Sequence, residues 1–280
     1  MQLSGPHTGN NMSTDSRTNP APLEGKYVGV ACSPMKFGPL MEALREMGAQ
    51  VDPLDVIAIR ELEDNSALDA ALVNLDSYTW TIFTSSYAAV FFSRRVFARG
   101  LEKELLKLRN VCAVGPGTAD TLRKHGIEVT LIPEEFVAEG VLRALADRHG
   151  GLTGLAGAGI LLPRAKEARD VLPRELRTAG ARVDVVPCYE TVEGRIHTEV
   201  LKRMRTHDPD LLIFTSSSTV RNFLSILGPE EGKRLICGAV VAALGPVTAG
   251  TVESSCKKAE IQPRENTIPS LLEAVREFYR

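Results

Sequence analysis

The sequence lacks any apolar run near the ~18 residues that a membrane-spanning helix needs. Its first 25 residues also lack the basic start and the apolar core of a secretory signal. Neither positive nor negative charge is in excess, because the sequence has 33 Lys and Arg residues and 35 Asp and Glu residues. Such a balance offers no general attraction for nucleic acid or for an anionic membrane. We therefore expect a cytoplasmic protein that has neither kind of partner.

Cysteine and histidine are both scarce, with five residues of each. The cysteines are scattered, odd in number and without a C-x-x-C pair, which favours reduced thiols over a disulfide framework. The histidines never fall at the spacing of metal ligands. The sequence therefore predicts no metal site.

What the sequence does contain is enough apolar material for two cores, since 44% of its 280 residues are hydrophobic. At roughly 100–200 residues per domain, this length predicts two domains. Residues 1–25 differ in composition, because they are rich in Ser, Thr, Asn, Gly and Pro. We expect these residues to form a disordered leader.

Three motifs occur twice in the chain and in the same order. L-R-x-x-G-A-x-V-D occupies residues 44–52 and 176–184, I-F-T-S-S occupies residues 82–86 and 213–217, and G-P-x-T-A-x-T occupies residues 115–121 and 245–251. The two copies of each motif are about 130 residues apart, and this constant spacing indicates an internal duplication.

Each copy alternates short apolar runs with amphipathic stretches. In the first copy we expect strands near residues 27–32, 50–54, 79–84, 111–114 and 128–132. Short and continuously apolar runs suit strands that are covered on both faces, as in a parallel sheet. Five such strands with helices between them predict an α/β fold with a flavodoxin-like, doubly wound sheet in each half.

The repeated T-S-S and G-P motifs fall where a predicted strand gives way to a helix. In doubly wound sheets, ligands bind at the carboxyl ends of the strands, where helices begin. Ser and Thr side chains at such positions cap the helix and stabilise it by about 1 kcal/mol each. The free N–H groups of the same turns also suit carboxylates or phosphates. Capping alone explains any one position, whereas four matching turns favour a ligand-binding role.

A dinucleotide site is a further hypothesis, raised by the glycines of Gly115-x-Gly117-x-x-Asp120. Asp120 takes the position of the third glycine, where a side chain obstructs close packing of helix on strand. Pro116 also removes an N–H group that would contact phosphate. The sequence therefore argues against a nucleotide cofactor.

Three cations, Arg164, Lys166 and Arg169, follow a predicted buried strand. A solvated helix face would explain them as ordinary exposed side chains. A clamp for a carboxylate explains them equally well, and Arg164 suits that role best because a guanidinium can donate two parallel hydrogen bonds.

Two further segments are L-P-R-A at residues 162–165 and P-C-Y-E-T at residues 187–191. Together with the paired motifs, they make the sequence resemble the uroporphyrinogen-III synthase family over nearly everything but the leader. The resemblance implies two flavodoxin-like domains. In this family the chain begins one domain, then builds the other and finally returns to complete the first.

Mapped onto this sequence, the resemblance implies one domain of residues 26–57 plus 191–280 and another of residues 58–190. The two crossings, near residues 56–60 and 188–192, would form a two-segment extended linker.

The resemblance also implies a substrate and a reaction. Hydroxymethylbilane, a linear tetrapyrrole with eight carboxylates, loses water and closes with inversion of its terminal D ring. The product, uroporphyrinogen III, serves haem, sirohaem and cobalamin biosynthesis. Electron-rich pyrroles supply the reactivity, so we expect a lyase that needs no cofactor. The task of the protein is then to position the substrate. The alternative is a two-lobed, non-catalytic protein that binds a small molecule.

We expect the chain to act as a monomer, because no long apolar stripe is left unassigned.

By motif, the resemblance assigns substrate binding to Thr84, Ser85, Ser86, Thr118, Arg164, Ser216, Ser217 and Thr248. Tyr189 matches a tyrosine of the family and is the candidate proton donor for loss of the hydroxyl group. A packed tyrosine with a satisfied hydroxyl is the alternative for this residue.

Overall fold

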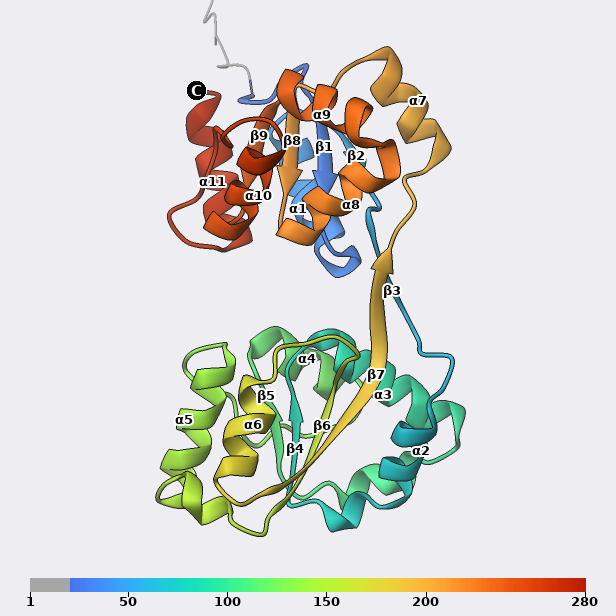
Figure 1. Cartoon of the computed structure of the whole chain (residues 1–280), viewed down its shortest axis with the longest axis vertical. Coiled ribbons are helices and arrows are strands. Elements are labelled where there is room, and N and C mark those ends of the chain that lie inside the picture. The colour runs from blue at the N-terminus through green and yellow to red at the C-terminus, as the bar shows by residue number, and fades with distance from the viewer. Residues whose placement is uncertain (1–20) are drawn as a thin grey trace, which may run out of the picture. The chain divides into compact units, whose positions relative to one another are not determined.

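The structure, a computed structural model, describes residues 21–280 and divides them into two compact units (Figure 1). Unit 1 holds the described residues up to Val56 together with Arg195–Arg280, and unit 2 holds Ile57–Gly194. Each unit is built from a mainly parallel sheet and helices, so the molecule belongs to the mixed α/β class.

In the described part of the chain, unit 1 contains a four-stranded parallel sheet in the order β2-β1-β8-β9. Its strands are β1 (Tyr27–Ala31), β2 (Gln50–Pro53), β8 (Leu211–Phe214) and β9 (Val240–Ala243). Its helices are α1 (Pro34–Glu46), α7 (Thr198–Thr206), α8 (Ser217–Leu227), α9 (Pro229–Gly238), α10 (Pro246–Ser255) and α11 (Ile268–Phe278). The central strands β1 and β8 are buried at every residue, which explains their apolar sequences.

Unit 2 contains a five-stranded sheet in the order β3-β7-β6-β4-β5. Its strands are β3 (Ile57–Arg60), β4 (Trp80–Phe83), β5 (Val111–Ala113), β6 (Gly159–Ala165) and β7 (Arg182–Glu193). Its α-helices are α2 (Ser66–Val73), α3 (Ser86–Ala98), α4 (Pro116–Lys124), α5 (Ala138–His149) and α6 (Val171–Thr178). Short 3-10 turns lie at Leu75–Ser77, Glu102–Lys107 and Leu152–Leu155.

Helices cover both faces of the unit 2 sheet, so neighbouring residues of one strand enter different cores. Phe83 and Leu161 pack in a core with side chains of α2, α3 and α4. Ile82 and Leu162 pack in a second core with side chains of α5 and α6. Because successive strand residues point to opposite faces, this arrangement requires apolar residues at both.

Strand β7 changes its partner along its length. Its first part pairs in parallel with β6, and its last four residues, Glu190–Glu193, pair antiparallel with β3. The antiparallel pair places Ile57 opposite Glu193 and Arg60 opposite Glu190.

The strand predicted near residues 128–132 is reduced to a single bridge between Leu131 and Cys112. Backbone hydrogen bonds join Leu131 to β5 on both sides of this bridge, from the Leu131 N–H to the Val111 carbonyl (3.1 Å) and from the Ala113 N–H to the Leu131 carbonyl (3.0 Å), whereas the Val111 N–H is taken by the Thr130 hydroxyl (3.0 Å). The prediction of a fifth parallel strand here is therefore wrong, and the fifth strand of unit 2 is the antiparallel β3.

The predicted disordered leader falls largely on residues 1–20, which lie outside the described residues. Residues 21–25 contradict the prediction. Leu23 is fully buried in the core of unit 1, and its N–H donates to the Met47 carbonyl (2.8 Å). The prediction is wrong for this turn, where burial of Leu23 and its hydrogen bond to Met47 attach the chain to unit 1.

The expectation of reduced thiols throughout is wrong for one pair. Cys237 in α9 and Cys256 after α10 form a disulfide, with their Cα atoms 6.0 Å apart. The fold brings these two cysteines together although they are 19 residues apart in the sequence. Cys32, Cys112 and Cys188 are free and buried.

Among residues 21–280, no helix combines the length and the apolar composition that crossing a membrane requires. The same residues contain no cluster of three or more His, Cys, Asp or Glu side chains that could hold a metal ion.

Candidate functional site

Each unit places two hydroxyl-bearing turns at the carboxyl edge of its sheet. In unit 2, β4 leads into α3 and β5 leads into α4; in unit 1, β8 leads into α8 and β9 leads into α10. Strands β4 and β5 are parallel neighbours, and so are β8 and β9. The two turns of each unit therefore lie side by side at the edge where ligands bind in such sheets.

In unit 2 the structure brings Ser85 and Tyr189 together. Ser85 is the N-cap of α3, where its hydroxyl accepts from the Ala88 N–H (3.0 Å), and it shares a hydrogen bond with the Tyr189 hydroxyl (3.0 Å). The Tyr189 ring is only 7% exposed and stacks on Phe91, with centroids 5.6 Å apart. Burial raises the pKa of Tyr189, and the hydrogen bond with Ser85 offsets part of that rise. Tyr189 is therefore a protonated, packed tyrosine whose hydroxyl can act as a hydrogen-bond donor.

Ser86 and Thr118 also meet in unit 2, because α3 and α4 start side by side. Their hydroxyl oxygens are 3.5 Å apart, and Thr118 is buried whereas Ser86 is half-buried. The backbone of the α4 turn is closely covered, since a Cβ on Gly115 would lie 3.1 Å from the Phe136 ring. A glycine at this position therefore lets Phe136 pack directly on the turn.

In unit 1 the corresponding hydroxyls are largely used by the helices themselves. Ser216 caps α8 by accepting from the Thr219 N–H (3.3 Å), and the Thr219 hydroxyl accepts from the Ser216 N–H (3.3 Å). The Ser216 hydroxyl also lies 2.9 Å from that of Ser218. Ser217 is half-buried at the first position of α8, and Thr248 is buried in the first turn of α10.

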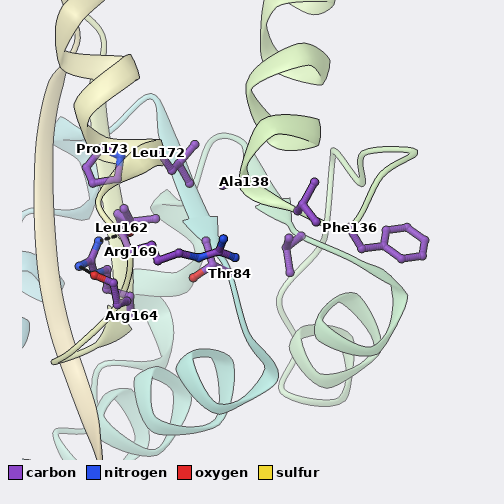
Figure 2. A pocket seen from close by; sticks show the side chains of 11 residues that line it. Thr84, Phe136, Ala138, Leu162, Arg164, Arg169, Leu172 and Pro173 are labelled. Atoms are coloured by element: carbon purple, nitrogen blue, oxygen red, sulfur yellow. Dashed lines mark hydrogen bonds between the residues drawn. The ribbon is translucent and has the colours of Figure 1, made fainter. Parts of the chain in front are cut away.

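Unit 2 also contains a cavity of about 240 Å³ at the carboxyl ends of β4, β5 and β6. Figure 2 shows Thr84, Arg164 and Arg169 gathered on one side of this cavity and Phe136 on the other. Val114, Leu162, Leu172 and Pro173 supply apolar walls. Of the predicted site residues, the cavity therefore brings Thr84 and Arg164 together.

The guanidinium of Arg164 is turned onto the loop that follows its own strand. Its Nη2 donates to the Ala168 carbonyl (2.8 Å) and to Asp170 Oδ1 (2.9 Å), and its Nη1 donates to the Arg169 carbonyl (3.3 Å). The side chain is 7% exposed, and its Nε has no hydrogen-bond partner among the described residues. The predicted two-pronged clamp is thus largely occupied by the protein, because three of its five N–H groups hold the loop and only Nε and one N–H of Nη1 are unused.

Sequence reasoning named Arg169 in a run of cations but did not place it in the site. It also missed Phe136, which the structure places over Gly115 and beside the cavity. Arg169 could have been chosen from the sequence by its position directly before the start of α6, where a cation has no favourable interaction with the helix dipole. Phe136 has no comparable sequence signal, because it follows a segment that forms only a single bridge.

Comparison with known proteins connects this geometry to one family. The family model for uroporphyrinogen-III synthase HemD matches residues 38–273. A uroporphyrinogen-III synthase of Synechococcus elongatus is 28% identical over 264 residues, which cover 92% of this chain and 97% of the relative. A putative uroporphyrinogen-III synthase of Methanocaldococcus jannaschii is 30% identical over 220 residues, covering 77% of this chain and 85% of the relative.

Solved structures show the same fold at low sequence identity. The crystal structure of uroporphyrinogen-III synthetase from Helicobacter pylori has a TM-score of 0.56 and 18% identity, covering 90% of this chain and 99% of the other. A mutant uroporphyrinogen III synthase from Thermus thermophilus has a TM-score of 0.55 and 16% identity, covering 90% and 98%. Because the family model matches most of the sequence, the chain belongs to the uroporphyrinogen-III synthase family.

Proposed function

We propose that this protein converts hydroxymethylbilane into uroporphyrinogen III and water, with inversion of the terminal D ring. It is thus a cyclising lyase of tetrapyrrole biosynthesis that needs no cofactor. The observation that carries the proposal is the family match over residues 38–273, which includes both sets of hydroxyl-bearing turns.

The chemistry of the substrate explains what the protein must supply. Loss of the hydroxyl group with a pyrrole N–H proton releases water and leaves an electrophilic azafulvene. Ring D attacks through its substituted carbon and forms a spiro intermediate. Its fragmentation and reclosure invert the ring, and a final proton shift from carbon restores the N–H. The pyrroles provide the electrons, so the protein has to hold the chain in one folded geometry.

The residues that we propose for holding the substrate lie at the carboxyl edges of both sheets. In unit 2 they are Thr84, Ser85, Ser86, Thr118 and Arg164, and in unit 1 they are Ser216, Ser217 and Thr248. Hydroxyls and free N–H groups at helix starts suit the eight carboxylates of the substrate. The hydroxyl of Ser216 has the weakest case, because capping and Ser218 already use it.

We propose Tyr189 as the hydrogen-bond donor that assists departure of the hydroxyl group. Its raised pKa keeps the phenol protonated, as a donor must be, and its bond to Ser85 fixes the direction of the hydroxyl. The alternative is that Tyr189 serves only in packing. Its stacking on the Phe91 ring fits this role equally well.

We further propose that the chain arose by duplication and that each domain combines strands from both copies. The domains are then residues 26–57 plus 191–280 and residues 58–190. The sheet orders support this, because β2-β1-β8-β9 and β7-β6-β4-β5 match strand for strand at about 130 residues' separation. In this pairing, β1 and β2 of the first copy share a sheet with β8 and β9 of the second. The antiparallel pair of β3 with the end of β7 would be the two-segment linker.

Isomer analysis tests the proposed function. The purified protein is incubated with freshly made hydroxymethylbilane, the products are oxidised, and the uroporphyrin isomers are separated. We expect the III isomer to predominate, whereas a control without protein gives the I isomer. Only the I isomer in both samples would favour the non-catalytic binding protein. The molar mass of the purified protein, measured by light scattering, tests the proposed monomeric state.

A further inference from the structure

The cavity of unit 2 has a charge that suits an anion. Arg164 and Arg169 line it, and no carboxylate is among its lining residues, although Asp170 next to the cavity pairs with Arg164 (2.9 Å) and leaves Arg169 as the main source of net charge (Figure 2). Thr84 adds a hydroxyl that can donate a hydrogen bond. The remaining lining is apolar or backbone, so the attraction between these groups and an anion is screened less than at an open surface.

Arg164 lines this cavity and carries one donor, Nε, that no described residue accepts from. Its Nε is buried and has no partner among the described residues, while both Nη atoms hold the following loop. A buried donor without an acceptor is unfavourable, and an acceptor that reached Nε would relieve this. The natural acceptor for a guanidinium N–H is a carboxylate oxygen.

Arg169 is held in place by its neighbour but has no acidic partner of its own. The structure gives it no ion pair with any side chain among residues 21–280, although its carbonyl accepts from Arg164. Arg164 thus fixes the loop from which Arg169 reaches the cavity. A cation on a fixed loop loses less freedom when it binds, which favours tighter binding.

The start of α5 adds a third source of positive charge. Val137 and Ala138 both line the cavity, and Val137 is the N-cap of this twelve-residue helix without a side-chain cap. The first N–H groups of a helix have no partner within it, and they carry part of the positive end of its dipole. Gly140 is needed there, because a Cβ would collide with the Glu135 carbonyl.

The size of the cavity limits what it can hold. At about 240 Å³ it is smaller than the ~300–1,000 Å³ of pockets that enclose a whole drug-sized ligand. It therefore fits a substituent better than a complete tetrapyrrole.

We propose that this cavity is the subsite for one acetate or propionate carboxylate of the linear tetrapyrrole. Arg169 is its ion partner, Arg164 Nε and the Thr84 hydroxyl are hydrogen-bond donors, and Arg164 is also the positioning residue of the Arg169 loop. The inference rests on the proposed function and deepens it, because it assigns one substrate charge to one place in unit 2.

The test compares Arg169→Met with Arg174→Met. Arg174 is a matched control, since it lies on the neighbouring α6, is exposed and is not part of the cavity lining. Uroporphyrin III, the oxidised product, is titrated into each protein and its fluorescence is followed. We expect the Kd to rise about tenfold or more for Arg169→Met, as for loss of a charge-assisted hydrogen bond, and to stay unchanged for Arg174→Met. Arg169→Lys should recover part of the loss because it restores the charge.

Steady-state kinetics with hydroxymethylbilane provide a second readout. We expect Arg169→Met to raise KM by a similar factor and to change kcat much less, because the ion pair exists before and during the reaction. The positioning role of Arg164 is tested at its exposed partner with Asp170→Ala, which removes one acceptor that holds the guanidinium without disturbing the buried core. This variant should weaken uroporphyrin III binding by a smaller factor than Arg169→Met does.

Coproporphyrin III, in which methyl groups replace the four acetates, identifies the substituent. If the subsite takes an acetate, Arg169→Met and the wild type bind coproporphyrin III equally. If it takes a propionate, the variant is weaker for both porphyrins. The subsite is overturned if Arg169→Met binds uroporphyrin III and turns over substrate as the wild type does. Failure of the proposed function is a separate result, namely a wild type that yields no excess of the III isomer.

Discussion

The turn after β5 in unit 2 and the turn after β9 in unit 1 begin with the same glycine and proline, yet different side chains cover them. Phe136 packs on Gly115, where an added Cβ would lie 3.1 Å from the ring. The side-chain amide of Asn266 packs on Gly245 at the same distance. The two turns therefore keep one backbone arrangement and offer a ligand different surfaces.

The strands at matching positions, β6 and β1, also end differently. β6 contains Arg164 near its end, and this residue holds the loop before α6, whereas β1 is followed almost at once by Ser33 and Pro34 at the start of α1. The scaffold of both units therefore fixes where helices begin. The chemistry offered to a ligand is then set by the few side chains that differ between the units.

The strongest test of this comparison removes a matched core ring from each unit. Phe83 packs edge-on against Phe92 (5.2 Å), and Phe214 packs in the same way against Phe223 (5.4 Å). We expect Phe83→Ala and Phe214→Ala each to lower the free energy of unfolding by about 3–5 kcal/mol, because both rings are fully buried.

Hydrogen exchange shows where this loss occurs. Phe83→Ala should speed exchange in the strands of unit 2, and Phe214→Ala in those of unit 1. Phe97→Ala is the control, because Phe97 is nearly half exposed. If either core variant speeds exchange equally in both units, the units do not have separate cores.

The next largest effect is expected for Tyr189→Phe. If Tyr189 assists loss of the hydroxyl group, kcat should fall by about 100-fold, while the packing on Phe91 is kept. Tyr78→Phe is a matched control, since Tyr78 is also a buried tyrosine of unit 2 and donates to Asp184 (2.8 Å). Both variants lose one hydrogen bond, so their stabilities should fall alike, by about 1 kcal/mol. Equal activities of the two variants would leave Tyr189 with packing alone.

A smaller effect is expected at the two matched N-caps. Ser85 and Ser216 share nearly the same backbone conformation, with φ −159° and ψ 153° and 159°, and both accept from the third N–H of their helix. We expect Ser85→Ala and Ser216→Ala each to cost about 1 kcal/mol of stability. Only Ser85 also binds Tyr189, so we expect Ser85→Ala alone to lower kcat, by up to about tenfold.

Glycine variants separate the cap from the hydroxyl contact at these positions. Ser85→Gly and Ser216→Gly should recover most of the stability, because glycine at an N-cap costs only a few tenths of a kcal/mol relative to serine. Activity should stay low for Ser85→Gly. If it returned together with stability, the contact with Tyr189 would have no role in the reaction.

Local sequence patterns were sufficient to predict the starts of several strands and helices. Apolar runs predicted β1 and β4 because both faces of these strands are covered, and the T-S-S motifs predicted helix starts because Ser85 and Ser216 are caps. The same rule failed to give the extent of pairing at residues 128–132, which join β5 at a single bridge while the side chain of Thr130 takes the Val111 N–H.

The direction of a long side chain could not be predicted in this way. Arg164 was expected to point at a ligand, but the carbonyls of Ala168 and Arg169 attract its guanidinium. Whether those carbonyls face the arginine depends on how the loop closes before α6, which is a matter of tertiary packing. Arg169 has only a weak signal in the sequence, its position directly before α6, and the cavity is what places it in the site.

The smallest predicted difference between the units concerns one ion pair in each. Asp69 in unit 2 receives two hydrogen bonds from Arg95 (2.7 Å each), and Glu231 in unit 1 receives two from Arg205 (2.8 and 2.9 Å). The hydrogen bonds from these arginines lower the pKa of both carboxyls. A lowered folded-state pKa stabilises the fold above the unfolded pKa of about 4, and this contribution is lost as the pH falls through the folded value.

We therefore expect Asp69→Asn to lower the free energy of unfolding by about 0.5 kcal/mol at pH 7, and to have no effect at a pH below both pKa values. Glu231→Gln should have a smaller effect, because the side chain of Arg205 is 59% exposed whereas that of Arg95 is 24% exposed. Urea unfolding at both pH values measures these differences. An effect of Asp69→Asn that persists at low pH would mean that the carboxyl acts through packing, since no charge is left there for Arg95 to stabilise.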